Sequence, residues 1–571
     1  MFISEFKEHR SDEDLPVPAS DWQFLSESVS DNVTMAAGLF TAEERPVAEA
    51  LAGIALANPF TEAREKLERE VLGDRYVAPD RYLLPGQPLH RLEGNLGRLM
   101  ERADALLEAV APRLARRTGI GPVEREIYEG LVHFAVFHRH ASGFDHLIAA
   151  ALPGSDAILG GGRTGVVEVE ARARSTVGTL FERCRRDLVR LLALPVLGGD
   201  VERMAALWFA FYFQVRRAWV HTFAFIHGGS DALVALRARL WQSIFTHDMG
   251  RYQRCLYARM GDITTLITGP SGSGKELVAR AIGLSRFVPF DAKERAFAAD
   301  FAGSFHPLNL SALSPTLIES ELFGHRRGAF TGAIGDREGY FETCGAHGTV
   351  FLDEIGETAP EIQVKLLRVL QTREFNRLGD TERRRFHGRI VAATNRDLTS
   401  EIRAGRFRED FFFRLCADRI ETPPLREVLG GNTDELRCLV AHICTAQAGP
   451  DEGPALCDEV VTWIGRELGR TYAWPGNFRE LEQCVRNIIV HGSYRPALGT
   501  ATGPGGGAAG GDWVAAAQAG RLTMDAILQA YCRRVFAEAG SLEEAARRLD
   551  CDRRTVRRYV QTGGSTADPA T

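Results

Sequence analysis

The chain has 571 residues, of which 45% are hydrophobic and 25% charged, and its formal net charge is −6. This length is too great for one domain and predicts three or four. The charge balance excludes a globally basic protein, so any contact with nucleic acid must come from a local patch. The ten cysteines form no Cys-x-x-Cys pair and show no zinc-ligand spacing, which predicts free thiols in a reducing cytosol.

The sequence predicts a cytoplasmic protein without a membrane partner. Its first ten residues are too charged for a secretory signal. The most apolar stretch, residues 204–215, has only about twelve residues before two arginines, too few to span a bilayer as one helix. We expect this stretch to be a buried helix.

Residues 1–227 are predicted to form an α-helical regulatory or sensory domain, whose input the sequence does not identify. Apolar residues recur every three or four positions in 92–107, 124–140, 176–194 and 201–226. There is no receiver-domain pattern of an acidic pair, a phosphorylatable aspartate and a distant lysine, so control by a phosphorelay is not expected.

Two groups of side chains in this domain have alternative interpretations. His133, His138, His140 and His146 lie beside phenylalanines, which is compatible with a metal or haem pocket. The absence of cysteine or carboxylate pairs at ligand spacing favours ordinary core or surface histidines instead. The aromatic run from Trp208 to Phe225 is interpreted first as a helix core and second as a ligand cavity.

A phosphate-binding loop is predicted after the strand-like residues 264–268 and before a helix at 276–284. Backbone N–H groups around Gly272 and Gly274 can hold a β-phosphate, while Lys275 reaches the β and γ oxygens. Glu276 stands where the general motif has the Ser or Thr that ligates magnesium, which shifts that role to another carboxylate and water. The expected nucleotide-binding residues of this loop are Gly269, Pro270, Ser271, Gly272, Ser273, Gly274, Lys275 and Glu276.

Two further apolar strands end in polar residues. Residues 349–352 lead into Asp353 and Glu354, which are suited to binding Mg²⁺ through water and to polarising an attacking water. The alternative is two acids that merely end a strand. Residues 390–395 form the other strand, which ends at Thr394 and Asn395.

Between these motifs lies the hexapeptide GAFTGA, made of Gly328, Ala329, Phe330, Thr331, Gly332 and Ala333. Its glycines and alanines allow the backbone to change conformation at low cost, and its tip offers one apolar and one hydroxyl contact. The alternative is a surface turn whose phenylalanine folds back onto the core.

Together these motifs resemble the central domain of bacterial enhancer-binding proteins, the AAA+ ATPases that activate transcription by sigma-54 RNA polymerase. The resemblance covers residues 228–494. It implies an α/β P-loop AAA+ subdomain at 228–425 and a helical lid at 426–495. It also implies that ATP and Mg²⁺ are bound and that the GAFTGA loop contacts the sigma factor.

The same resemblance implies roles for single residues. Asn309 would hold the catalytic Glu354, and Asn395 would sense the γ-phosphate. Arg479, in the segment Trp-Pro-Gly-Asn-Phe-Arg-Glu-Leu, would contact nucleotide from the lid. Arg408 and Arg414 would act as arginine fingers on the next subunit, which implies a homo-oligomeric, hexameric ring.

Two segments of this region are less regular. Residues 377–386 are expected to form a second pore-facing loop, with a solvated hairpin as the alternative. Residues 428–432 replace an Arg-rich turn that is usual in the family, so the connection to the lid departs from its pattern.

The C-terminal part is predicted to be a Gly-rich linker at 496–512 and an all-α module at 513–571. Helices are expected at 522–538, 542–549 and 553–561, with Gly540 as a stop and Ser541 to Glu544 as a capping box. This module resembles the Fis-type helix-turn-helix, and a solvated basic helix is the alternative. The expected DNA-binding residues are Arg553, Arg554, Thr555, Arg557 and Arg558.

The resulting hypothesis is a sigma-54-dependent transcriptional activator. It would bind upstream double-stranded DNA and use ATP hydrolysis in an AAA+ ring to remodel the closed complex of sigma-54 RNA polymerase. One alternative is a regulator of ordinary promoters that uses the core for nucleotide-gated oligomerisation. Another is a remodelling ATPase with a different client. The intact hexapeptide argues against the first alternative, and the helix-turn-helix argues against the second.

Overall fold

The computed structural model describes residues 38–151, 166–300, 302–496 and 523–561. The chain divides into two compact units, Met1–Val461 with Trp474–Gly492, and Thr462–Ala473 with Ser493–Thr571. None of the described helices is both long and apolar enough to cross a membrane.

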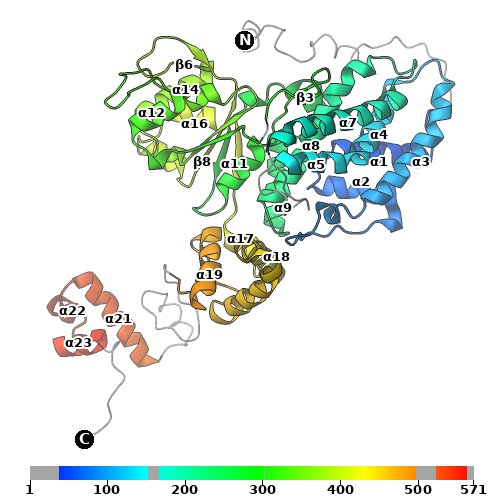
Figure 1. The fold of residues 1–571 in the computed structure, drawn as a ribbon. Coiled ribbons are helices and arrows are strands. Elements are labelled where there is room, and N and C mark those ends of the chain that lie inside the picture. The colour runs from blue at the N-terminus through cyan, green and yellow to red at the C-terminus, as the bar shows by residue number, and fades with distance from the viewer. Residues whose placement is uncertain (1–37, 152–165, 301, 497–522, 562–571) are drawn as a thin grey trace. The chain divides into compact units, whose positions relative to one another are not determined.

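The described residues before 228 form helices and turns without a strand, which confirms the helical prediction for this region (Figure 1). The first predicted helix begins later than expected, at Leu96, because Leu89–Glu93 form a 3₁₀ turn. The Asn95 amide fixes this start by donating to Val77 O at 2.9 Å and to Glu68 Oε2 at 3.1 Å. The helices are α1 (Glu44–Leu56), α2 (Glu62–Leu72), α3 (Leu96–Ala115), α4 (Pro122–Arg139), α5 (Ala141–Ala151), α7 (Val166–Leu192) and α8 (Val201–Phe225).

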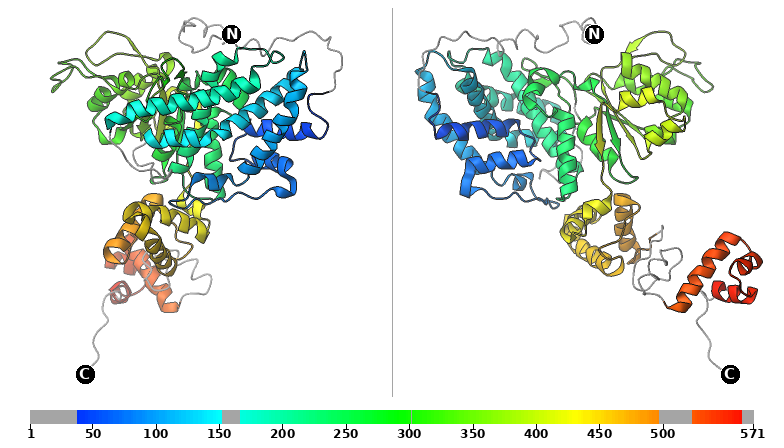
Figure 2. Two further views of the ribbon diagram at one scale, coloured as in Figure 1. Left: turned by 45° about the vertical axis from the view of Figure 1, so that its right-hand side comes forward. Right: turned by 180° about the vertical axis from the view of Figure 1, so that it is seen from behind.

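Helix α8 joins the helical region to the α/β subdomain. Its aromatic side chains belong to the core, as the first interpretation predicted. The centroid of the Phe209 ring lies 5.4 Å from that of Phe144 and 4.7 Å from that of Phe290 in the α/β subdomain. The buried Gln214 amide donates to Ser285 O at 3.0 Å. Two views in Figure 2 show the helical region beside the subdomain that holds the sheet.

A parallel five-stranded sheet lies at the centre of the α/β subdomain, with strand order β4-β5-β8-β1-β9. Its strands are mostly apolar because helices cover both faces. Helices α12 (Pro315–Phe323), α14 (Pro360–Thr372) and α16 (Glu409–Leu415) lie on one side, and α9 (Asp231–Phe245) and α11 (Lys275–Gly283) lie on the other (Figure 1). The strands are β1 (Thr265–Thr268), β4 (Phe305–Asn309), β5 (Thr349–Asp353), β8 (Arg389–Thr394) and β9 (Asp418–Glu421).

Three helices follow β9 and are here called the lid: α17 (Leu425–Leu429), α18 (Thr433–Glu467) and α19 (Asn477–His491). The irregular residues 428–432 end α17 and turn the chain through Gly430 and Gly431, whose φ angles are 50° and 79°. Asn432 then caps the start of α18, since its Oδ1 accepts from Asp434 N at 2.8 Å. Helix α18 is kinked at Gly449, next to Pro450.

The helical region also touches the lid. Asn432 donates its side-chain N–H to Tyr82 Oη at 3.1 Å. The fully buried Glu435 of α18 accepts from Gly229 N at 2.9 Å, and His227 stacks on His442 with ring centroids 3.8 Å apart. Residues that lie far apart in the sequence therefore meet at the first turns of α18.

The C-terminal module contains α21 (Met524–Ala539), α22 (Leu542–Arg548) and α23 (Arg553–Gln561), close to the predicted helices. Val535, Ala545, Ala546 and Val556 form its small core. Gly540 ends α21 with φ 70°, and Ser541 caps α22 by accepting from Glu544 N at 3.3 Å. The predicted linker lies, apart from residue 496, outside the described residues.

Candidate nucleotide site and exposed loops

The glycine-rich loop between β1 and α11 packs closely against neighbouring segments. Gly272 and Gly274 have φ angles of 74° and 87°, in the left-handed region that favours glycine. A Cβ atom at Gly272 would lie 2.5 Å from Gly476 O of the lid. A Cβ atom at Gly269 would lie 2.1 Å from Thr422 Oγ1, which contacts Ser273 Oγ at 2.6 Å. The backbone is thus shaped as an anion-binding turn at the N-terminus of a helix.

Lys275 is held inside this loop. Only 7% of the residue is exposed, and its ammonium donates to Gly269 O at 3.1 Å and to Pro270 O at 3.2 Å. Burial lowers the pKa of Lys275, while the nearby Glu354 and Asp353 carboxylates act in the opposite direction. Glu276 instead pairs with Arg280 on the exposed face of α11, at 3.1 Å.

The two acids at the end of β5 lie near Lys275 and the end of β8. Burial raises the pKa of Asp353, and the charge of Glu354 raises it further. Glu354 has φ 55°, and its backbone N–H donates to Asp353 Oδ1 at 3.0 Å. Its carboxylate accepts from Asn395 N at 3.4 Å. The structure therefore brings Asp353, Glu354 and Asn395 together at the carboxyl ends of neighbouring strands.

Asn309 ends β4 directly opposite Asp353 in the strand register. Its Oδ1 accepts from Ser311 N at 2.9 Å and from Ser311 Oγ at 2.8 Å. No hydrogen bond joins Asn309 to Glu354 in the described part of the chain. The contact with the glutamate stays a prediction.

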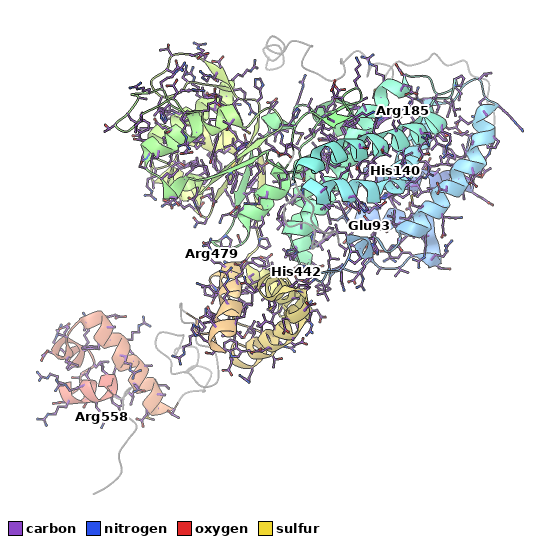
Figure 3. The ribbon with its side chains drawn as sticks, in the orientation of Figure 1. Glu93, His140, Arg185, His442, Arg479 and Arg558 are labelled. Atoms are coloured by element: carbon purple, nitrogen blue, oxygen red, sulfur yellow. The ribbon has the colours of Figure 1, made fainter. Side chains whose placement is uncertain are left out.

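The lid closes over the glycine-rich loop. Phe478 N donates to Gly272 O at 3.1 Å, and the Arg479 guanidinium reaches Ser271 Oγ at 3.4 Å. Figure 3 labels Arg479 at the end of α19 nearest the α/β subdomain. The exposed guanidinium thus lies beside the turn that is shaped for an anion.

The two predicted arginine fingers differ in their surroundings. Arg408 stands at the N-cap position of α16, and its side chain pairs with Asp410 at 2.7 Å. Arg414, six residues later, is exposed and makes no ion pair with any described residue. Its neighbour Phe413 is also exposed, at 67%. Arg414 is therefore the guanidinium that is available to a second molecule.

The GAFTGA hexapeptide forms a compact loop. Gly328 N donates to Ala333 O at 2.9 Å, and Ala333 N donates to Phe330 O at 3.0 Å. The Phe330 ring folds back onto the buried His325, with ring centroids 5.0 Å apart. Thr331 and Gly332 remain exposed at the tip. In this conformation the Thr331 residue is exposed, whereas Phe330 is half-buried against His325.

The segment at 377–386 is a hairpin, β6 (Glu374–Phe375) with β7 (Arg384–Arg385), that packs against the GAFTGA loop. Arg326, at the base of the GAFTGA loop, bonds Asp336 at 2.7 Å and Asp380 at 3.1 Å. Arg326 N also donates to Leu378 O at 3.0 Å. A cavity of about 360 Å³ lies between this hairpin, Ala329 and α14. Hydrogen bonds therefore join the two segments, and this contact was not predicted from the sequence.

The clustered histidines are bonded or buried. His133 Nδ1 lies 2.7 Å from Tyr212 Oη, and His140 Nε2 lies 2.9 Å from Asp187. Burial lowers the pKa of His133 to about 4 and that of His138 well below its usual value. Among the residues that the structure describes, no group of three or more His, Cys, Asp or Glu side chains could hold a metal ion.

The basic side chains of α23 lie on one face. Val556 is fully buried, while Arg553, Arg554, Arg557 and Arg558 are exposed and Thr555 is half-buried. Arg553 pairs with Glu543 of α22 at 2.5 Å, and Arg558 lies over the Tyr559 ring. The arrangement presents an arginine-rich helix face to solvent.

Three residues near these sites were not predicted from the sequence. Thr422 supports the glycine-rich loop, Asn477 joins that loop to the lid, and Ile334 is 88% exposed just after the hexapeptide. Only Ile334 carried a signal, as a large apolar residue beside an exposed loop. Asn477 lies in the segment that predicted Arg479, but its own contact with the loop, like that of Thr422, is tertiary and was not predicted.

Comparison with known proteins identifies the central region. Residues 249–421 match the family described as the sigma-54 interaction domain. The chain is 47% identical over 227 residues to the Nif-specific regulatory protein of Azotobacter vinelandii, covering 40% of each chain. It is 44% identical over 246 residues to the DNA-binding transcriptional regulator NtrC of Azospirillum brasilense, covering 42% of this chain and 46% of the relative.

A similar match, 44% identity over 229 residues, joins it to the anaerobic nitric oxide reductase transcription regulator NorR of Escherichia coli O157:H7, covering 40% of this chain and 42% of the relative. The chain thus spans less than half the length of these curated relatives. A crystal structure of NtrX from Brucella abortus in complex with ATP matches 70% of this chain and 80% of that one, with 22% identity and a TM-score of 0.38. The sequence matches confirm the predicted resemblance: residues 249–421 are similar to the sigma-54 interaction domain, and the central part of this chain is similar to parts of these regulatory proteins.

Proposed function

We propose that this chain is a transcriptional activator that uses ATP hydrolysis to remodel the closed complex of sigma-54 RNA polymerase. The observation that carries the proposal is the exposed tip of the GAFTGA loop, Thr331 and Gly332, within the domain that matches the sigma-54 interaction family. The alternative of nucleotide-gated oligomerisation at ordinary promoters leaves this exposed loop without a role.

The groups at the glycine-rich loop fit a Mg²⁺-ATP substrate. The turn at Gly272 and Gly274 leaves no room for a Cβ at Gly272. Among the described residues, the ammonium of Lys275 donates only to two backbone carbonyls, which a phosphate can replace as its partner. Bound Mg²⁺ would neutralise phosphate charge, held by Asp353 with water, because Glu276 is already paired with Arg280.

The chain's own residues then account for hydrolysis. Glu354 accepts a proton from the attacking water, and the N–H of Asn395 orients its carboxylate. Asn309, opposite Asp353, is proposed to restrain Glu354 before hydrolysis. Arg479 contacts the nucleotide from the lid side of Ser271.

The proposed assembly is a homo-oligomeric, hexameric ring. Arginine fingers stabilise transition-state charge when they are supplied by a neighbouring subunit. Arg414 is exposed and unpaired within the described residues, while Arg408 would first have to leave Asp410. We therefore assign the main finger role to Arg414 and a supporting one to Arg408.

The C-terminal module is proposed to bind upstream double-stranded DNA through α23. Its exposed arginines are suited to phosphate contacts, and Thr555 to a base or phosphate contact. The buried Val556 supports this orientation, because it fixes the apolar face of α23 toward the module's own core.

A salt titration tests the DNA contact. Replacing Arg554 and Arg558 together by Ala is expected to lower the slope of log affinity against log salt by roughly two units, one for each lost phosphate contact. Arg534→Ala is the matched control, because Arg534 lies on α21 and pairs with Glu538 at 3.2 Å. An unchanged slope in the double variant would show that α23 does not face DNA.

The direct test of the proposed function is capture of sigma-54 by the full chain. Capture is expected with an ATP transition-state analogue and is expected to be much weaker without nucleotide, because we propose that Phe330 contacts the client only after its ring leaves His325. A Lys275→Ala chain serves as the control that lacks the ammonium of the phosphate loop. Absence of capture with the analogue, for a chain that hydrolyses ATP, would favour a different client.

A further inference from the structure

One asparagine of the lid lies where three parts of the ATPase domain meet. Asn477 is 4% exposed and stands at the start of α19. Its Nδ2 donates to Ser271 O of the glycine-rich loop at 2.9 Å. Its Oδ1 accepts from the backbone N–H of Leu425 at 2.9 Å, where the chain enters the lid. A single amide therefore links the loop, the entry to the lid and α19.

The backbone conformation of Asn477 also favours asparagine at this position. Asn477 has φ 53°, in the left-handed region that asparagine adopts more readily than other non-glycine residues. Its own N–H donates to Trp474 O at 2.8 Å, which closes a tight turn. Because of this turn, Phe478 N donates to Gly272 O and the Arg479 side chain points toward Ser271.

The chemistry of the contact requires an amide. The group must donate on one side, to a carbonyl, and accept on the other, from an N–H. An ionised aspartate keeps the acceptor for Leu425 but places a negative oxygen against Ser271 O. Glycine suits the backbone angle but loses both bonds. The two substitutions therefore separate the side-chain contact with the loop from the conformation of the turn.

We infer that Asn477 is a positioning residue for nucleotide binding. It fixes the backbone at Ser271 and Gly272 in the shape that accepts phosphate and sets Arg479 beside it. The inference rests on the proposed ATPase function and adds a residue outside the phosphate loop on which nucleotide affinity depends. It also predicts that the loop and the lid entry move together, since the same amide holds both.

The test compares Asn477→Asp, Asn477→Gly and the parent in the full chain. Equilibrium binding of a fluorescent ADP analogue is measured together with KM and kcat for ATP, and thermal unfolding is recorded without nucleotide. Asn477→Asp is expected to weaken ADP binding by about tenfold or more, as for loss of one buried hydrogen bond and its replacement by repulsion. Asn477→Gly is expected to weaken it as well, although its backbone is unstrained.

Asn487→Asp is the matched control, because Asn487 is the other asparagine of α19 and its side chain bonds, among the residues that the structure describes, only to Gln483 O of its own helix. This control is expected to bind ADP like the parent. Parental ADP affinity in both Asn477 variants would overturn the inference, as would a loss of thermal stability with unchanged affinity of the folded protein. Failure of the parent itself to bind the ADP analogue would instead refute the proposed ATPase function.

Discussion

Replacing Glu354 by Gln is expected to reduce ATP hydrolysis by about a hundredfold to ten-thousandfold, the range found for loss of a positioned general base. The amide keeps the size of the side chain and can still lie near Asn395, but it cannot accept the proton of the attacking water. ATP binding is expected to persist, because Lys275 and the glycine-rich loop are unchanged. Phosphate release and equilibrium binding of a slowly hydrolysed ATP analogue measure the two properties separately.

Glu357→Gln provides the matched control for this experiment. Glu357 lies three positions further on, is exposed and pairs with Arg396 at 2.5 Å. The Glu357→Gln substitution therefore removes a carboxylate near the site without changing the proposed base. It is expected to hydrolyse ATP at close to the parental rate. If Glu354→Gln also hydrolysed ATP at that rate, the assignment of the base would be wrong.

Local patterns were sufficient to predict the parts of the nucleotide site that depend on a single strand and the turn after it. An apolar run followed by Gly269 to Lys275, and another followed by Asp353 and Glu354, placed both motifs at the carboxyl ends of strands. The sequence did not predict the strand order, because parallel neighbours are joined by long crossovers. The order β4-β5-β8-β1-β9 is what places Asn309 beside Asp353 and Asn395 near Glu354.

Contacts between segments that lie far apart in the sequence could not be predicted either. The hydrogen bond from Asn432 to Tyr82 joins residues 350 positions apart, and no periodicity in either segment reports it. Glu435 would be expected on a solvated helix face, yet it is fully buried against Gly229, and burial raises its pKa. A charged residue at this position is explained only by the hydrogen bond that it accepts from Gly229 N.

The GAFTGA loop shows how far a motif can be interpreted before its conformation is known. The sequence left two alternatives, a loop that presents both Phe330 and Thr331 and a turn whose phenylalanine folds back. The structure combines them, because Phe330 packs on His325 while Thr331 stays exposed. The His325 imidazole is itself fixed by Ser320, whose Oγ lies 2.7 Å from Nδ1. Engagement of a client through the phenyl ring would therefore require the ring to leave this contact.

Thr331→Ala is expected to separate the two proposed activities of the domain. The hydroxyl lies at the exposed tip of the loop and makes no hydrogen bond with any described residue, so its loss leaves the nucleotide site untouched. ATP hydrolysis is expected to stay near the parental rate, while sigma-54-dependent open-complex formation falls to background. Both are measured on one preparation, by phosphate release and by transcription from a sigma-54 promoter.

Thr399→Ala is the matched control for the loop experiment, because Thr399 is an exposed threonine on α15 (Leu398–Arg403) of the same subdomain, away from the hexapeptide in sequence. It is expected to retain both activities. Normal open-complex formation by Thr331→Ala would count directly against a client contact at the loop tip. If Thr331→Ala lost both ATP hydrolysis and open-complex formation, Thr331 would be needed to couple the loop to the nucleotide site. The exposed position of its hydroxyl does not favour that role. The proposed division of labour therefore depends on one hydroxyl group that the fold leaves free for a partner.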